Sequence, residues 1–202
     1  MVDVSKFKLI ERSENLAMYN YQEELLRRIE EGDGENAIRL SILLTLSPIG
    51  DYMEALKMLS SFSKEFSNIK LKIIESYLSL QWGNGIHTEL LRKIVSVDLH
   101  ENDELTSLIY YLIALQYKQD GNKKDAMKAI EVSVEKCSFH VNNLLMYAKY
   151  LDNNSAYYIQ LAKNNLKSIQ IEGLESYTDP DIFIGEHISG IYMSQDAFLN
   201  IG

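Results

Sequence analysis

The sequence predicts an all-α protein, an α-solenoid of antiparallel helix pairs, from three observations. Apolar residues recur at helical spacing through most of the 202 residues. Only two prolines, Pro48 and Pro180, interrupt the chain, so long helices are permitted nearly everywhere. Turn glycines fall at Gly50, Gly85 and Gly121, which are 35 and 36 residues apart. A repeat of this length is typical of helical solenoids.

Short polar turns separate the apolar-periodic segments and leave no room for strands. The predicted helices are, in order, ENLAMYNYQEELLRRIEEG (14–32), ENAIRLSILLTL (35–46), DYMEALKMLSSFSKEF (51–66), IKLKIIESYLSLQW (69–82), IHTELLRKIVSV (86–97), ELTSLIYYLIALQYKQ (104–119), KKDAMKAIEVSVEK (123–136), VNNLLMYAKYL (141–151) and SAYYIQLAKNNLKSI (155–169).

The boundaries of the first helices have local causes. The acid-before-base pair Glu24–Arg28 supports the first helix. The second helix ends before Pro48, because the residue that precedes a proline is pushed out of the α region. Asp51 provides an N-cap for the third helix. A break at residues 67–68 starts the fourth helix, which we expect to stop at Gly83–Asn84–Gly85.

Asparagine and aspartate mark the remaining helix starts. Either Asn102 or Asp103 caps the helix that follows, and Asn122 caps the next one. Residues 152–154 join the last two predicted helices. Pro180, directly after Asp179, is expected at the first position of a further helix.

One helix pair, residues 107–138, resembles a tetratricopeptide repeat (TPR), so the expected solenoid is TPR-like. The positions that match the family pattern of aromatic, apolar, small and turn residues are Tyr110, Ile113, Ala114, Tyr117, Gly121, Ala126, Ile130 and Ser133. A small side chain lets two helices approach closely, and aromatic rings fill the space beside that contact. The resemblance extends over about residues 37–170, and in the pairs 37–68 and 72–103 leucines replace the small residues at 43, 78 and 90.

The resemblance implies a concave groove that binds a peptide or protein. In this family the first helix of each pair lines the groove. The corresponding residues are Leu40, Leu44, Lys72, Glu75, Ser79, Trp82, Leu108, Tyr111, Leu115 and Lys118. Some members of the family grip the terminal carboxylate of a peptide with Lys, Asn and Arg side chains at these positions. Most of the residues here are apolar, so such a carboxylate clamp is not expected. The alternative is that they belong to the core, because two of the first helices are apolar nearly all round.

The C-terminal segment differs in composition. From Glu172 to the end there are six acidic residues and no lysine or arginine. The apolar residues of the same segment are Ile182, Phe183, Ile184, Ile188, Ile191, Tyr192, Met193, Phe198 and Leu199. So much apolar surface is expected to be covered. We expect one domain, 1–202, with N-terminal helices (1–34), helix pairs (35–171) and a segment (172–202) that caps the solenoid, fills its groove or docks on another protein.

Several classes of chemistry are disfavoured. A net charge of −9 disfavours binding of nucleic acid, because the phosphates require a clustered basic surface on the protein. We find no signal-like or membrane-spanning apolar run, and the single Cys137 cannot form an internal disulfide, so a cytoplasmic location is expected. Cys137 and His140 have the C-x-x-H spacing of two zinc ligands, but no second pair completes a four-ligand site. We therefore expect Cys137 to be a packed side chain and not a zinc ligand.

Other candidate motifs have structural explanations. The segment GDGENA (32–37) is similar to the glycine-rich motif that binds dinucleotides. That motif follows a strand, whereas a helix is predicted before residue 32. The tail residues Asp179, Asp181, Glu186 and His187 could ligate a metal, but their spacing fits no calcium loop. We therefore expect no cofactor and no metal.

The sequence favours a non-enzymatic adaptor that binds a basic or hydrophobic protein or peptide. A dedicated chaperone or immunity protein that masks a secreted protein or toxin is an alternative, and a peptide-sensing regulator is another. An enzyme with a cryptic site is the rival class, and a deep pocket with converging polar groups and shifted pKa values would favour it.

Overall fold

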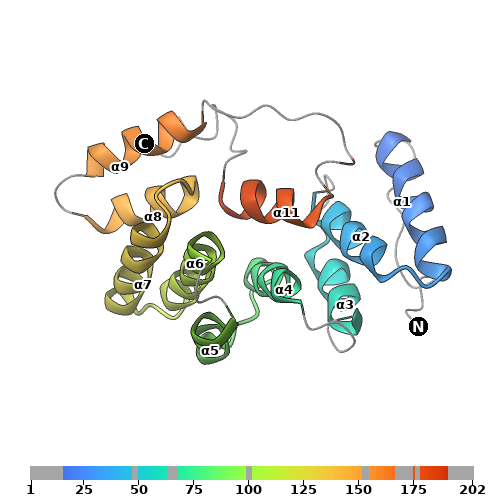
Figure 1. Cartoon of the computed structure of the whole chain (residues 1–202), viewed down its shortest axis with the longest axis horizontal. Coiled ribbons are helices and arrows are strands. Elements are labelled where there is room, and N and C mark those ends of the chain that lie inside the picture. The colour runs from blue at the N-terminus through green and yellow to red at the C-terminus, as the bar shows by residue number, and fades with distance from the viewer. Residues whose placement is uncertain are drawn as a thin grey trace. The chain divides into compact units, whose positions relative to one another are not determined.

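The computed structural model describes residues 16–46, 50–62, 68–98, 102–151, 155–166, 175 and 178–190, and every regular element in these ranges is a helix (Figure 1). The all-α prediction is confirmed for this part of the chain. The α-helices are α1 (Leu16–Glu30), α2 (Gly34–Leu46), α3 (Tyr52–Phe62), α4 (Ile69–Gln81), α5 (Thr88–Asp98), α6 (Asp103–Gln119), α7 (Lys123–Lys136), α8 (Val141–Tyr150), α9 (Ser155–Leu166) and α11 (Pro180–Ile182). A short π-helix, η2 (Phe183–Ile188), follows α11 directly.

The contacts divide the chain into two compact units. The first unit comprises residues 1–84 and 171–183, and the second comprises 85–170 and 184–202. The boundary falls inside the predicted helix pair 72–103, so α4 belongs to the first unit and α5 to the second. In α5, Leu90 stands where a tetratricopeptide repeat has a small residue, and it is 51% exposed.

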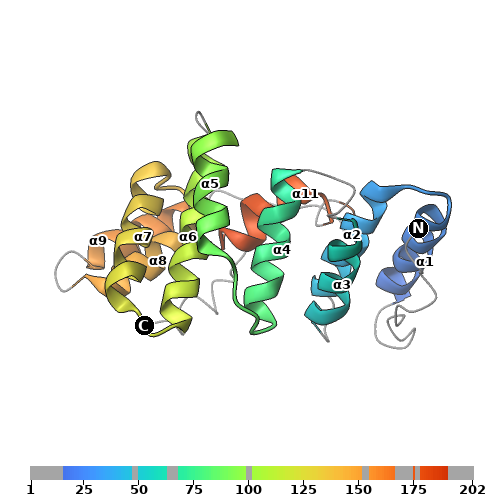
Figure 2. The ribbon, with the colours of Figure 1, turned by 90° about the horizontal axis from the view of Figure 1, so that it is seen from below.

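In the first unit consecutive helices pack against each other, α1 on α2, α2 on α3 and α3 on α4, as both views of the ribbon show (Figures 1 and 2). The short helix α11 contacts α2. Leucine, isoleucine and methionine side chains fill the space between these helices, among them Leu25, Leu43 and Met58. Burial of such side chains is the main favourable contribution to folding.

The second unit is built from α5 to α9, and the contact between α6 and α7 is its most extensive. Ala114 of α6 and Ala126 of α7 are both fully buried. Their small side chains allow the two helices to approach closely, as expected for the pair 107–138.

Glycine closes three of the described helices, α1, α4 and α6, in the same way. At the end of α6, Gly121 has a φ of 73°, and the N–H of Asn122 donates to the carbonyl of Tyr117 at 2.8 Å. At the end of α4 this conformation is adopted by Gly83, with a φ of 84°, and not by Gly85. Gly85 lies further along the connection between α4 and α5, within the predicted stop Gly83–Asn84–Gly85. Because α4 ends at Gln81, the left-handed residue has to come two positions later.

The predicted N-caps are present in the described residues. Asp51 Oδ1 accepts a hydrogen bond from the N–H of Glu54 at 3.1 Å. Asn102 and Asn122 cap α6 and α7, and Asp179 caps α11 with Pro180 at its first position. Each side-chain oxygen satisfies a backbone N–H that the helix itself leaves free.

Within the described ranges, no helix has both the length and the apolar character needed to cross a membrane.

Candidate functional site

A cavity of about 360 Å³ opens on the first unit where the starts of α2, α4 and α11 meet. Its apolar lining, which we call the floor, consists of Ile38, Leu71, Ile74 and Pro180. The remaining lining residues, which we call the rim, are Gly34 and the polar residues Glu35, Asn68, Lys70, Asp179 and Asp181. An apolar floor with a few polar groups at its edge is typical of a ligand or side-chain binding site.

N-cap side chains in the local sequence explain why three helices begin at this cavity. Asp33 Oδ1 accepts from the N–H of Glu35 at 3.1 Å, Asn68 Oδ1 from Lys70 at 2.9 Å, and Asp179 Oδ1 from Asp181 at 2.9 Å. These side chains occupy backbone donors that would otherwise attract an anion.

Carboxylates dominate the charge of the rim. Lys70 Nζ forms an ion pair with Asp181, and Glu35 forms one with Arg39 of its own helix at 3.1 Å. Asp179 also belongs to the rim. Because exposed ion pairs are weak and exchange readily, these carboxylates remain open to a basic group from outside.

The C-terminal segment provides one side of this cavity. Thr178 and Tyr21 share a hydrogen bond of 2.9 Å between their hydroxyl groups. Phe183 is only 1% exposed, and its ring meets that of Tyr77 edge-on, with 6.1 Å between the centroids. The expectation that the segment packs on the helices therefore holds for residues 178–183. Residues 191–202 lie outside the described part of the chain.

The segment is also held in the second unit. The N–H of Asn142 in α8 donates to the carbonyl of Ser189 at 2.7 Å, and its side-chain Nδ2 donates to the carbonyl of Ile188 at 3.1 Å. Ile184 and Ile188 are buried. The apolar residues of the tail thus reach the core, as their composition predicts.

None of the ten residues predicted for the groove lines this cavity. Four of them, Leu40, Leu44, Leu108 and Tyr111, are buried, in agreement with the alternative that they belong to the core. Burial also raises the pKa of the Tyr111 hydroxyl well above its usual range. Buried side chains of this kind stabilise the fold.

The other predicted groove residues are at least partly accessible. Four of them, spaced along one face of α4 in the first unit, are Lys72, Glu75, Ser79 and Trp82. Lys72 and Glu75 form an ion pair at 2.8 Å, and Trp82 is 49% exposed. Leu115 is half-buried and Lys118 exposed in the second unit.

A buried polar cluster lies in the second unit, and the sequence analysis missed it. Ser107 Oγ lies 3.1 Å from Nδ1 of His140 and 3.2 Å from Ser133 Oγ. Asn143 Nδ2 donates to Ser133 Oγ at 2.7 Å and to Ser107 Oγ at 3.0 Å. The available signal was the pair of polar residues His140 and Asn143 at the start of a largely apolar helix.

The cluster resembles a nucleophile with its base, but its burial argues for a structural role. Glu104 lies 3.7 Å from Nε2 of His140, which completes a carboxylate–imidazole–hydroxyl series. Ser107 is fully buried, and none of these groups lines the cavity. Burial lowers the pKa of His140, which favours the neutral imidazole, and Glu104 opposes this shift.

The described residues contain no group of three histidine, cysteine or acidic side chains that could hold a metal ion. Cys137 is a half-buried free thiol at the end of α7. The possible tail ligands are divided between the units, with Asp179 and Asp181 in the first and Glu186 and His187 in the second.

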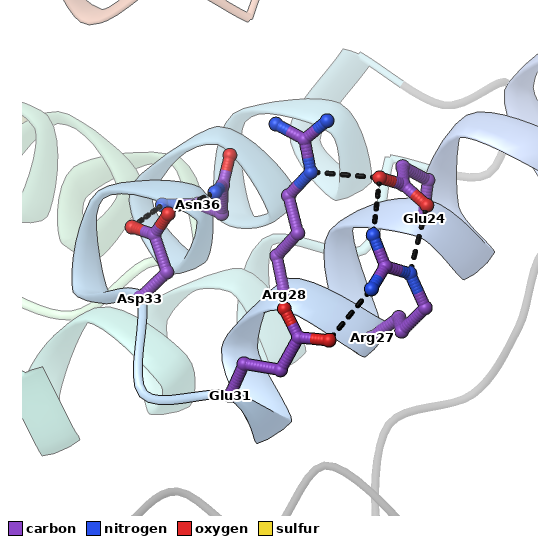
Figure 3. A network of polar contacts seen from close by, with 6 residues as sticks. All are labelled: Glu24, Arg27, Arg28, Glu31, Asp33 and Asn36. Atoms are coloured by element: carbon purple, nitrogen blue, oxygen red, sulfur yellow. Dashed lines mark hydrogen bonds and ion pairs between the residues drawn. The ribbon is translucent and has the colours of Figure 1, made fainter.

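Two separate sets of polar contacts lie at the end of α1 and at the start of α2 (Figure 3). Glu24, Arg27, Arg28 and Glu31 form ion pairs at the end of α1, and the Asn36 side chain donates a hydrogen bond to Asp33 at the start of α2. Hydrogen bonds from Arg27 and Arg28 lower the pKa of Glu24 to about 2. These arginines are thus engaged by carboxylates of their own helix and do not form a basic patch.

Comparison of the chain with family models, with curated proteins and with solved structures gives no match.

Proposed function

We propose that this protein is a non-enzymatic module that binds a protein or peptide, and that the cavity of the first unit receives a side chain of the partner. The observation that supports this function is the combination of an apolar floor with a rim of carboxylates at three helix starts. The TPR-like solenoid arrangement and the cytoplasmic location belong to the same proposal.

The chemistry of the cavity suits a particular kind of peptide. Ile38, Ile74 and Pro180 would bury an apolar side chain, at a gain of about 25 cal/mol per Å² of apolar surface. Asp179 and Glu35 at the rim would attract a neighbouring lysine or arginine. The accessible face of α4 with Lys72, Glu75 and Trp82 offers further contact area in the same unit.

The acidic rim also supports a more specific version of this function. A dedicated chaperone or an immunity protein masks its partner, and an acidic surface would complement a basic or sticky one. The net charge of −9 agrees with such a role. A general adaptor and a peptide-sensing regulator are the broader versions of the same binding activity.

Ile38→Trp tests the cavity as the binding site. Ile38 is half-buried at the floor, so a tryptophan there would fill the cavity without replacing a fully buried core residue. The matched control is Leu90→Trp, which places the same side chain at an exposed apolar position of the second unit.

The experiment captures partners on the full-length protein, identifies them by mass spectrometry, and then titrates the purified partner by calorimetry. We expect Ile38→Trp to weaken binding at least about tenfold, the loss that corresponds to roughly 1.4 kcal/mol. Leu90→Trp should bind as the wild type does. Equal affinity of wild type and Ile38→Trp would exclude the cavity as the site.

A further inference from the structure

Asn84 differs in its surroundings from the other described asparagines. It lies with Gly85 in the connection between α4 and α5, and both residues are exposed. Its backbone N–H donates to the carbonyl of Ser79 at 2.9 Å, at the end of α4. Its side-chain amide forms no hydrogen bond with any residue that the structure describes. The amide group is therefore unrestrained at an exposed position.

The other described asparagines are held in place. Asn68, Asn102 and Asn122 are N-caps, and their side-chain oxygens accept hydrogen bonds from backbone N–H groups at 2.9 Å, 2.9 Å and 3.2 Å. The rest lie within α1, α2, α8 or α9, where the regular backbone directs each N–H along the helix axis. In both settings the side chain would have to leave a cap, or the backbone a helix, before the amide could meet the nitrogen of the next residue.

An asparagine that precedes a glycine can react with its own main chain. The nitrogen of the following residue attacks the side-chain Cγ, and a five-membered ring closes because a single carbon separates Cγ from Cα. Glycine favours this ring closure, since it has no Cβ to crowd the attacking nitrogen and adopts backbone conformations that other residues avoid. Asn84 is the only asparagine of the sequence that precedes a glycine.

We propose that Asn84 is a modification site, at which the chain deamidates spontaneously through a cyclic imide with Gly85. A bond forms between the Gly85 nitrogen and Asn84 Cγ, the bond from Cγ to Nδ2 breaks, and ammonia leaves with the proton of the Gly85 N–H. Water then opens the ring. Opening at Cγ gives aspartate, and opening at the main-chain carbonyl gives isoaspartate, in which the chain continues through the former side chain. The reaction consumes only water.

Either product changes the connection between α4 and α5. The new carboxylate adds one negative charge to the net charge of −9, and it lies beside the C-terminus of α4, where the helix dipole disfavours an anion. Isoaspartate also lengthens the main chain by one carbon just before Ile86, whose N–H donates to Gln116 Oε1 at 2.7 Å. The modified chain is therefore a second, more acidic form of the protein with an altered connection.

The test is prolonged incubation of the full-length protein at neutral and at mildly alkaline pH, followed by tryptic digestion and mass spectrometry. The tryptic peptide of residues 73–92 contains Asn84 and no other asparagine, so its conversion from amide to acid reports on this site alone. We expect Asn84 to react at least about tenfold faster than the capped and helical asparagines, a ratio that corresponds to about 1.4 kcal/mol in the activation barrier. Aspartate and isoaspartate peptides are separated by chromatography.

A first variant tests the attacking nitrogen. A Cβ at Gly85 would lie 3.4 Å from Gln116 Oε1, which is an ordinary contact, and the φ of Gly85 is outside the left-handed region, so Gly85→Ala fits the structure. This variant should slow the reaction of Asn84 at least about tenfold, because the added methyl group crowds the nitrogen.

A second variant separates the structure from the sequence. Lys123→Gly places a glycine after Asn122, whose side chain accepts from the N–H of Asp125 at 3.2 Å and donates to Asp125 Oδ2 at 2.8 Å. Because these hydrogen bonds hold the amide as a cap, Asn122 should remain unreacted while Asn84 of the same chain deamidates. Circular dichroism confirms that the helices of both variants are intact.

Three results would overturn the proposal. The peptide of residues 73–92 could keep its amide as long as the peptides with capped or helical asparagines do. An unchanged rate in Gly85→Ala would mean that the Gly85 nitrogen is not the attacking group. Equal reaction of Asn122 and Asn84 in Lys123→Gly would show that sequence alone sets the rate. None of these residues lines the cavity, so the result is independent of the proposed function.

Discussion

Two groups of buried polar side chains, one in each unit, satisfy their hydrogen bonds in different ways. In the first unit the hydroxyls of Ser41 and Thr45 donate to carbonyls of their own helix, at 2.7 Å and 2.9 Å. In the second unit Asn143 of α8 bonds to Ser107 of α6 and Ser133 of α7. The first pattern is local to α2, whereas the second connects three helices.

This difference determines what holds each unit together. A hydroxyl bonded within its own helix is satisfied wherever that helix lies, so it does not select one packing arrangement. A network across three helices is satisfied in one arrangement only, and an unpaired member would be costly. We therefore expect apolar packing to dominate the stability of the first unit and polar contacts to matter more in the second.

The largest expected effect tests apolar packing in the first unit. Phe183→Ala removes a ring that is almost fully buried against Tyr77, so the free energy of unfolding should fall by about 3–5 kcal/mol. Phe139→Ala, at a 47% exposed position, should change it by less than about 0.5 kcal/mol. Urea denaturation measures both. Equal midpoints would mean that residues 178–183 do not stabilise the first unit.

The polar cluster is tested by Asn143→Leu. Loss of the amide leaves the buried Ser107 and Ser133 hydroxyls with one partner fewer, which should cost about 2–3 kcal/mol. Thr45→Val in the first unit removes a hydroxyl that bonds only to its own helix and should cost less than about 1 kcal/mol. If chemical denaturation gives the same loss for both variants, the contrast between the units is wrong.

The close contact between α6 and α7 is tested by Ala114→Leu. Ala114 has no exposed surface, so the added carbons should overpack the contact and cost about 1–3 kcal/mol. The control Ala156→Leu makes the same change at an exposed position of α9. An unchanged denaturation midpoint for Ala114→Leu would show that the helices can move apart freely.

The smallest expected effect is the pH dependence that His140 adds to the second unit. Burial lowers its pKa in the folded state below the ordinary value of 6.5, so the unfolded chain binds the proton more readily. The contribution of the neutral imidazole is therefore complete above about pH 6.5 and decreases as the pH falls below that value. Glu104, the acidic group nearest to the ring, opposes this loss.

Unfolding curves between pH 5 and 8 measure this contribution. With His140→Gln, the free energy of unfolding should decrease less steeply below about pH 6.5. Part of the decrease should remain, because burial also lowers the pKa of His187. His87→Gln, at an exposed position, serves as the control. An unchanged acid slope in His140→Gln would show that the cluster does not keep this imidazole neutral.

Helices and their ends could be predicted because their causes are local. Asp51, Asn102, Asn122 and Asp179 cap the helices they were expected to cap, since a cap depends on residues two or three positions away. The end of α4 was expected at Gly83–Asn84–Gly85, but spacing alone does not reveal which of the two glycines adopts the left-handed conformation.

The candidate site could be predicted only in part. Composition alone indicated that the C-terminal segment would be covered, and Phe183, Ile184 and Ile188 are indeed buried. The sequence does not reveal that Asp179 and Asp181 lie beside Lys70, because more than a hundred residues separate them from that lysine.

What the sequence determined by itself is the all-α class, the helix boundaries and the apolar nature of the tail, which depend on periodicity and on contacts within one or two turns. The tertiary structure alone decided that Leu40 and Leu108 are core residues, that three helix starts surround one cavity, and that Ser107, Ser133 and Asn143 meet. The reason is that burial and long-range hydrogen bonds depend on which distant residues come together, and no local pattern encodes that choice.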